Sequence, residues 1–156
     1  MYPLIKLLNL LIRPVVHDCN EKIINKIKIF QSDIMFTNIA VTLVILIVLD
    51  MMWFQLSGPT IYMPMFTKIN GQSGYMVITS AIISWLLIAI LINMFAKSNY
   101  DALILGLLSY GIYNATNFAT IRQWTLSTFI IDTVWGGIVC LTAYSLLPKL
   151  LALSPL

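Results

Sequence analysis

Charged residues are scarce in this sequence, and their scarcity excludes a soluble protein. Only 10% of the 156 residues are charged, whereas 60% are hydrophobic. A soluble domain carries about 25% charged residues, because its surface faces water. We therefore predict an all-α integral membrane protein whose first partner is the lipid bilayer. The length fits one compact bundle and no second domain.

Residues that bind metals or catalyse reactions are also few. The chain has one histidine, His17, and its two cysteines, Cys19 and Cys140, form neither a disulfide framework nor a metal-binding spacing. We find no Ser-His-Asp arrangement and no phosphate-binding loop in the sequence. A net charge of +3 is too small to indicate nucleic acid. We expect no metal and no cofactor. An enzyme is the least supported function, since Asp50 and Asp132 could act as acid and base but nothing points to a substrate.

Residues 1–35 are expected to form a basic, amphipathic segment ahead of the membrane domain. The apolar run up to Ile12 is too short to cross a bilayer and is stopped by Arg13-Pro14. Asp18 and Glu21 have the spacing of a capping box, which predicts a helix start. One face of that helix is apolar and its neighbours are basic: Ile23, Ile27, Phe30 and Ile34, with Lys22, Lys26 and Lys28. Such a pattern fits a helix that lies on the membrane surface. The alternatives are a solvated connector and a helix that packs on a partner protein.

Residues 36–156 are predicted to form a four-helix transmembrane domain. The spans are expected at about 38–54, 75–95, 100–118 and 127–147, each long enough for a hydrocarbon core about 30 Å thick. Pro148 is expected to end the last helix. The connection at 57–74 contains Gly and Pro residues that break regular structure, yet it is apolar. We expect this connection to lie on the bundle or in the interface, and a lid is the functional alternative.

The distribution of Lys and Arg predicts the orientation. Seven of these residues fall before the first span, between spans two and three, or in the C-terminal tail, and only Lys68 and Arg122 fall on the opposite side. Cytoplasmic segments carry the excess of basic residues. Both termini are therefore expected in the cytoplasm or its topological equivalent, although the sequence names no particular membrane.

The polar residues of the spans are expected to converge. At 1.5 Å per residue, Asp50 lies about 18 Å and Asn114 about 21 Å from the inner ends of their spans, and Asp132 lies about 8 Å from the outer end of its own. The third distance is measured from the opposite side of a core about 30 Å thick, so all three residues lie at a similar depth. The three side chains are therefore predicted to meet in the outer half of the membrane. Residues at helical spacing beside them complete the predicted cluster: Trp53, Tyr110, Tyr113, Asn117 and Trp135, with Trp124 in the turn.

Two functions remain open for this cluster. A carboxylate costs about 3 kcal/mol at the centre of a spanning helix, so buried acids mark functional sites by default. The cluster would then bind or transport a small solute, ion or lipid headgroup, and Asp50 and Asp132 could share a proton. Alternatively the cluster is a set of hydrogen bonds between helices that fixes their packing. The chain would then be a structural or assembly subunit of a larger membrane complex or a membrane-containing virus particle.

Other features of the spans predict packing. Small residues four apart, such as Ala102 with Gly106 and Gly136 with Cys140, allow close helix approach. Ser84, Trp85 and Asn93 on the second span are expected to lie deeper than the cluster and to serve helix contacts.

Four segments together resemble a known family. These are Leu49-Asp50-Met51-Met52-Trp53, the run from Gly106 to Thr120, Trp124, and Asp132-Thr133-Val134-Trp135-Gly136. The pattern is similar to a family of small membrane proteins, domain of unknown function 2177, over about residues 36–147. The resemblance implies a four-helix membrane domain without an established activity. It also implies an acid where this chain has Asn114, so one acid is neutral here. Residues 1–35 lie outside the resemblance, and they could attach the protein to a larger assembly.

Overall fold

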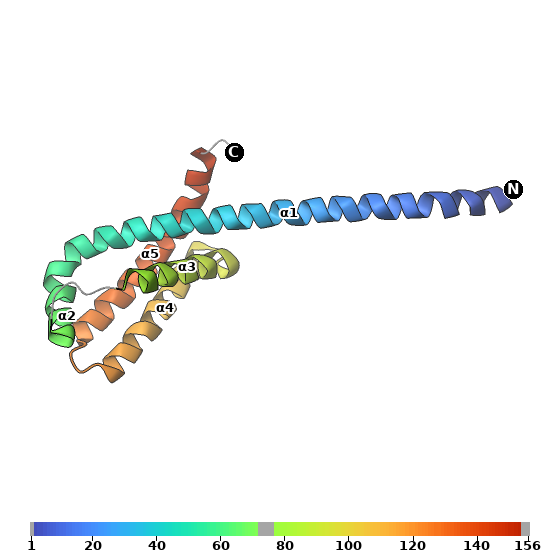
Figure 1. Ribbon diagram of the computed structural model, residues 1–156. Coiled ribbons are helices and arrows are strands. Elements are labelled where there is room, and N and C mark those ends of the chain that lie inside the picture. Colours follow the sequence, from blue (N-terminus) through green and yellow to red (C-terminus); the bar gives the residue numbers. More distant parts are fainter. Residues whose placement is uncertain (1, 72–76, 154–156) are drawn as a thin grey trace. The chain divides into compact units, whose positions relative to one another are not determined.

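The protein is helical throughout the part that the structure describes. The structure, a computed structural model, describes the backbone of residues 2–71 and 77–153 and the side chains from residue 24 onward in those ranges. The elements in chain order are α1 (Tyr2–Ser57), the short π-helix η1 (Gly58–Tyr62), α2 (Met63–Asn70), α3 (Ile78–Phe95), α4 (Asn99–Thr120) and α5 (Leu126–Leu153) (Figure 1). Contacts divide the chain into two units, residues 1–37 and 38–156.

Helix α1 is unbroken, which corrects two predictions about the N-terminal segment. The expected stop at Arg13-Pro14 and the expected helix start at Asp18 both fall inside this helix. A proline removes one backbone hydrogen bond and costs about 3 kcal/mol, but the turns on either side still propagate. Because the helix continues past Pro14, the backbone N–H groups near Asp18 donate to carbonyl oxygens four residues earlier and need no side-chain cap. Farther along α1, the apolar side chains of Ile27, Phe30 and Ile34 are exposed.

The connection after α1 is helical, whereas the sequence predicted irregular structure. Pro59 lies in the first turn of η1 and Pro64 in the first turn of α2. Proline suits these positions because the first N–H groups of a helix have no partner within the helix. Gly71, with φ of 72°, ends α2 in the left-handed conformation. The Gly and Pro residues therefore mark where short helices begin and end. Residues 72–76 of the predicted connection lie outside the described residues.

Helix α5 continues to Leu153, so the prediction that Pro148 ends it is wrong. Prolines are tolerated in membrane helices because neighbouring groups satisfy the carbonyl that loses its donor. The other predicted spans agree with the helices to within a few residues: α3 begins at Ile78 and not at 75, and α4 extends to Thr120.

Three of the described stretches are long and apolar enough to cross a membrane. They lie within Ile24–Asn70, Ile78–Phe95 and Leu126–Leu153. Helix α4 has 22 residues, which suffices for a bilayer. It is less apolar than α3 and α5, because Ser109, Asn114, Thr116 and Asn117 lie along it. The chain is thus an all-α membrane protein, three of whose described helices are candidate spans. The fourth span stays a prediction.

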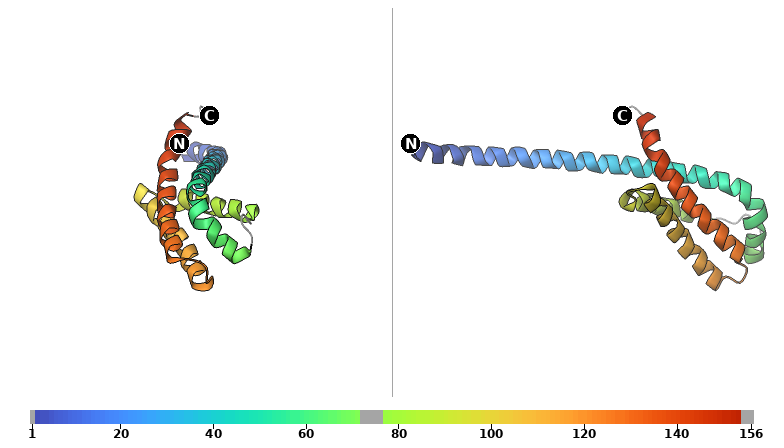
Figure 2. Two further views of the ribbon diagram at one scale, coloured as in Figure 1. Left: turned by 90° about the vertical axis from the view of Figure 1, so that its left-hand side faces the viewer. Right: turned by 180° about the vertical axis from the view of Figure 1, so that it is seen from behind.

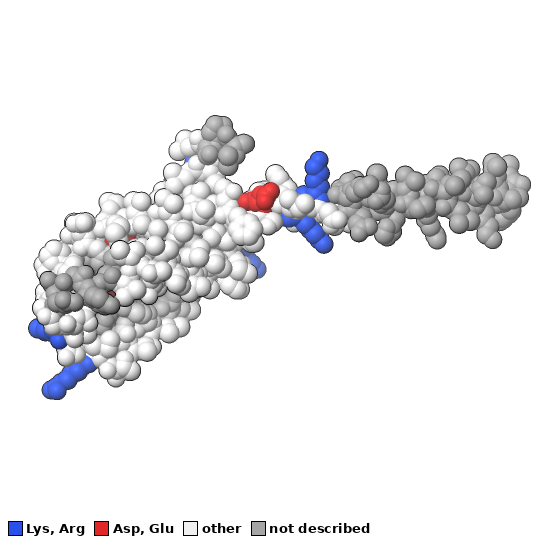
Figure 3. Space-filling view, in the orientation of Figure 1, with Lys and Arg blue, Asp and Glu red and all other residues white. Residues whose placement is uncertain are grey.

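Within the described part of residues 38–153, α1, α3 and α5 pack around the larger of two apolar cores. Leu46 from α1, Ala89 and Ile92 from α3, and Val139 and Ala143 from α5 form this core. Helices α4 and α5 run antiparallel and side by side (Figures 1 and 2). Most of the face in Figure 3 carries no charge, and basic side chains project at the end where α2 and the α4–α5 turn lie. Such a surface suits contact with lipid.

Candidate functional site

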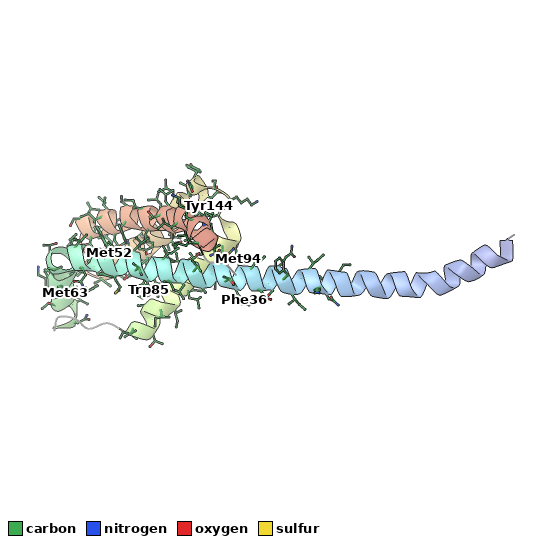
Figure 4. All side chains as sticks on the ribbon, turned by 90° about the horizontal axis from the view of Figure 1, so that it is seen from above. Phe36, Met52, Met63, Trp85, Met94 and Tyr144 are labelled. Atoms are coloured by element: carbon green, nitrogen blue, oxygen red, sulfur yellow. The ribbon has the colours of Figure 1, made fainter. Side chains whose placement is uncertain are left out.

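Asp50 is the acceptor at the centre of one buried polar group. It lies on α1 with only 4% of its surface exposed. Its Oδ1 accepts a hydrogen bond from Trp135 Nε1 at 2.7 Å. Its Oδ2 accepts from Trp85 Nε1 at 2.6 Å and from the Tyr110 hydroxyl at 3.2 Å. Trp85 projects from α3 (Figure 4), Tyr110 from α4 and Trp135 from α5, so this carboxylate joins four helices.

Asp132 is the second buried carboxylate, and it lies on α5 with 8% of its surface exposed. Its Oδ1 accepts a hydrogen bond from the Tyr62 hydroxyl, at the end of η1. Its Oδ2 accepts from Nδ2 of Asn114 at 2.7 Å. Asn114 on α4 is fully buried, and its Oδ1 accepts from Trp124 Nε1 at 3.1 Å. This pair is the contact that the heights of Asn114 and Asp132 predicted.

Aromatic side chains connect the two carboxylates. Trp53 Nε1 donates to the Tyr62 hydroxyl at 3.1 Å, and the Trp53 ring stacks on Trp135 with centroids 4.6 Å apart. Trp135 in turn donates to Asp50. A second connection runs through Tyr110, whose hydroxyl reaches Asp50 and whose main-chain oxygen accepts from Asn114 at 2.9 Å. We call these side chains the carboxylate network: Asp50, Trp53, Tyr62, Trp85, Tyr110, Asn114, Trp124, Asp132 and Trp135.

Two residues expected in the cluster lie outside its hydrogen bonds. Tyr113 is 53% exposed and stands edge-on to Trp124, with ring centroids 5.7 Å apart. The Nδ2 atom of Asn117 is buried without a hydrogen-bond partner among the described residues. Both residues share a helix face with Tyr110 and Asn114, but the neighbouring helices cover only part of that face. Helical spacing alone does not show how much of a face is covered.

The sequence interpretation missed Trp85 and Tyr62. Trp85 was assigned to deeper helix contacts, yet its indole donates to Asp50. A depth argument could have found it. Trp85 precedes the end of α3 at Phe95 by ten residues, about 15 Å, close to the 18 Å expected for Asp50. Tyr62 gave no comparable signal, because its position depends on η1 folding back onto α5. Asn93 does serve a helix contact, donating to Thr42 Oγ1 at 3.0 Å.

A second, smaller apolar core covers the Asp132–Asn114 pair. It consists of Tyr62 and Met65 from η1 and α2 and Trp124 from the α4–α5 turn, all nearly buried, with partly buried residues around them. Tyr62 and Trp124 each direct a polar atom inward to this pair. The apolar connection therefore packs on the membrane domain, as its composition predicted.

A shallow apolar groove lies beside the stacked indoles. Its walls are the rings of Trp53 and Trp135 and the exposed aliphatic side chains of Ile130, Ile131, Val134 and Ile138.

The comparisons with known proteins decide the family. The family described as "Predicted membrane protein (DUF2177)" matches residues 35–147. The chain belongs to this family. No curated protein and no solved structure matches the chain. The DUF2177 region contains every residue of the carboxylate network and leaves most of the N-terminal segment outside it. The family description states no activity, so the geometry of the network is the basis for a function.

Proposed function

We propose that this DUF2177 protein is a four-span membrane protein whose carboxylate network binds and conducts a small cation. The observation that supports this proposal is the chemistry of the donors. Asp50 and Asp132 are buried in membrane helices, and the groups that donate to them are indoles, phenols and an amide, all neutral. A buried carboxylate without a countercharge is costly. A bound cation would supply the missing positive charge.

The decisive variant is Asp132→Asn. The new amide can accept from Asn114 through its oxygen and donate to Tyr62 through its nitrogen, so the packing should survive while the charge is lost. We expect wild-type protein in vesicles to conduct protons, sodium or potassium, measured with an internal pH dye and radioactive ions, and the variant to fall to the level of empty vesicles. The matched control is Asp33→Asn, which alters an exposed acid on α1 and should conduct normally.

Asp132→Leu separates this proposal from a purely structural role. If the network only fixes helix packing, the Asn variant should behave as wild type and the Leu variant should lose about 1–2 kcal/mol of stability. Wild-type vesicles that conduct none of the three ions, or an Asn variant that conducts as well as wild type, would contradict the proposed function.

The proposed topology places both termini on one side of the membrane. In sealed vesicles, an impermeant thiol reagent should label Lys149→Cys from one side and Thr67→Cys from the other, since both positions are exposed and lie at opposite ends of the proposed bundle. Protein without the native cysteines, Cys19→Ser and Cys140→Ser, provides the background. Equal labelling of both positions would mean that the four-span topology is wrong.

The second candidate is a structural or assembly subunit, and the exposed apolar side chains of residues 24–36 favour it. Ile27, Phe30 and Phe36 are exposed beside Lys26 and Lys28. Deleting residues 2–30 should leave the 36–156 domain inserted and folded, measured by detergent gel filtration and circular dichroism. If this candidate holds, a stoichiometric protein partner should copurify with the full chain and be lost on deletion. A truncated protein that fails to insert would show that the segment belongs to the membrane domain.

A further inference from the structure

We infer that the cation is a proton and that its binding atom is Oδ1 of Asp132, with Tyr62 as the group that delivers it. This inference rests on the proposed function and specifies its substrate. The directions of the hydrogen bonds in the carboxylate network support this assignment, because a hydroxyl donor can become an acceptor and an indole N–H cannot.

A metal cation does not suit the network. Sodium, potassium and divalent ions need several oxygen ligands whose lone pairs point at the ion. Here four indole N–H groups, from Trp53, Trp85, Trp124 and Trp135, donate within the network, and an indole nitrogen only donates. Within the described residues, no three His, Cys, Asp or Glu side chains gather as metal ligands. A proton needs no such shell and adds directly to a carboxylate oxygen.

Asp50 is poorly arranged to accept that proton. Its Oδ1 faces the indole N–H of Trp135, and its Oδ2 faces the indole N–H of Trp85. A protonated carboxyl must direct its own O–H at an acceptor, and neither indole can accept. The Tyr110 hydroxyl could accept, but it is the longest of the three contacts at 3.2 Å and shares Oδ2 with Trp85. Protonation of either Asp50 oxygen would therefore point the new O–H at an indole N–H, so that two donors face each other.

Asp132 has the opposite arrangement at Oδ1. Its single partner there is the Tyr62 hydroxyl, which both donates and accepts. The Tyr62 oxygen receives one hydrogen bond from Trp53 Nε1, which leaves a lone pair for an O–H from Asp132. Meanwhile Oδ2 keeps its bond from the Asn114 amide, so that oxygen remains the carbonyl oxygen of the protonated carboxyl. The bond between Tyr62 and Asp132 can thus reverse while Trp53 and Asn114 keep their acceptors, and only the Tyr62 O–H has to turn away from Asp132.

The proton transfer balances as a relay. A hydronium ion that reaches the covering η1–α2 segment gives a proton to the Tyr62 oxygen and leaves as water. The original O–H bond of Tyr62 breaks, and that proton forms the O–H bond of Asp132 Oδ1. Tyr62 ends as a neutral phenol that accepts from Asp132 and from Trp53, and no electron is transferred.

The titratable groups that face Asp132 from neighbouring elements are Asp50 on α1, Tyr62 on η1, and Tyr110 and Tyr113 on α4. The phenols are neutral over the ordinary pH range. Asp50 is therefore the group among these four that can carry a charge over that range.

Infrared difference spectroscopy of the full chain in lipid tests this assignment. A protonated carboxyl has a carbonyl stretch that a carboxylate lacks, and replacing H₂O by D₂O shifts it. We expect such a band to grow as the pH falls, Asp132→Asn to remove it, and Asp50→Asn to retain it. Tyr62→Phe should shift its frequency, because the carboxyl O–H loses its acceptor while the ring packing stays. Asp33→Asn reports the contribution of an exposed acid.

The outcomes separate this inference from the proposed function. Absence of the band, or its loss in Asp50→Asn, would overturn the assignment to Asp132. So would a frequency that Tyr62→Phe leaves unchanged in a variant whose circular dichroism matches wild type. Conduction of sodium or potassium but not protons would overturn the proton while leaving the proposed cation site intact. An Asp132 band in vesicles that conduct nothing would support the proton site and contradict conduction.

Discussion

Gly106→Ala should separate helices α4 and α5 and give the largest loss of stability of any single methyl group added to this protein. A Cβ at position 106 would overlap the carbonyl oxygen of Gly136 and come within 2.8 Å of Cys140 Cβ. The first of these atoms belongs to the backbone of a long helix and cannot rotate away. Overpacking costs about 1–3 kcal/mol when side chains can adjust, and we expect at least about 3 kcal/mol here.

Gly111→Ala is the matched control on the same helix. Its added Cβ would lie 3.5 Å from Thr133 Cγ2, an ordinary contact. Ala also favours a helix over Gly by about 1 kcal/mol, so this variant should be as stable as wild type or slightly more so. Unfolding in mixed micelles, followed by far-ultraviolet circular dichroism, measures both variants. Equal stability of the two variants would show that α4 and α5 are not packed this closely.

Asp50→Leu should cost nearly as much stability, for an electrostatic reason. The carboxylate accepts from Trp85, Trp135 and Tyr110, and leucine would leave all three donors without an acceptor. A buried donor that loses its partner costs about 1–3 kcal/mol, so we expect a loss of roughly 3 kcal/mol or more. The cost should appear as separation of α1 from α3, α4 and α5, because these donors come from the other three helices.

Asp50→Asn distinguishes this explanation from loss of packing volume. Its amide has nearly the same shape, but its nitrogen must face an indole N–H in either orientation, against Trp135 or against Trp85. We expect an intermediate loss, about 1–3 kcal/mol, smaller than for Leu. Asp33→Asn should leave the free energy of unfolding unchanged, since Asp33 is exposed. A double-mutant cycle with Trp85→Phe should recover part of the loss, and strict additivity would contradict the direct hydrogen bond.

The sequence by itself determined the class of this protein and much of its polar interior. A hydrophobic fraction of 60% with 10% charge excludes a soluble surface, and the apolar runs give the approximate positions of α3, α4 and α5. The contact between Asn114 and Asp132 was also predictable. A helix rises by a fixed 1.5 Å per residue, so residue number converts to height whenever two helices begin at known ends.

Local signals were less reliable where a single residue had to end or begin a helix. Pro14 and Pro148 were expected to stop helices and do not, and Pro59 and Pro64 were expected in irregular structure but begin helices. A proline removes only its own N–H. Whether a helix continues past a proline depends on the neighbouring turns and on which other group donates to the carbonyl four residues earlier. The local sequence does not reveal that second donor.

Only the tertiary structure decided which aromatic side chains complete the carboxylate network. Tyr62 and Trp85 lie 70 and 35 residues from the carboxylates they contact. Height along a helix is set by residue number, but rotation of one helix about its axis relative to another is set by packing, here by the close approach of α4 and α5 at Gly106 and Gly136. That rotation leaves Tyr113 exposed. The packing of α3 against the apolar core places Trp85 beside Asp50. The folding back of η1 over α5 likewise brings the Tyr62 hydroxyl to Asp132.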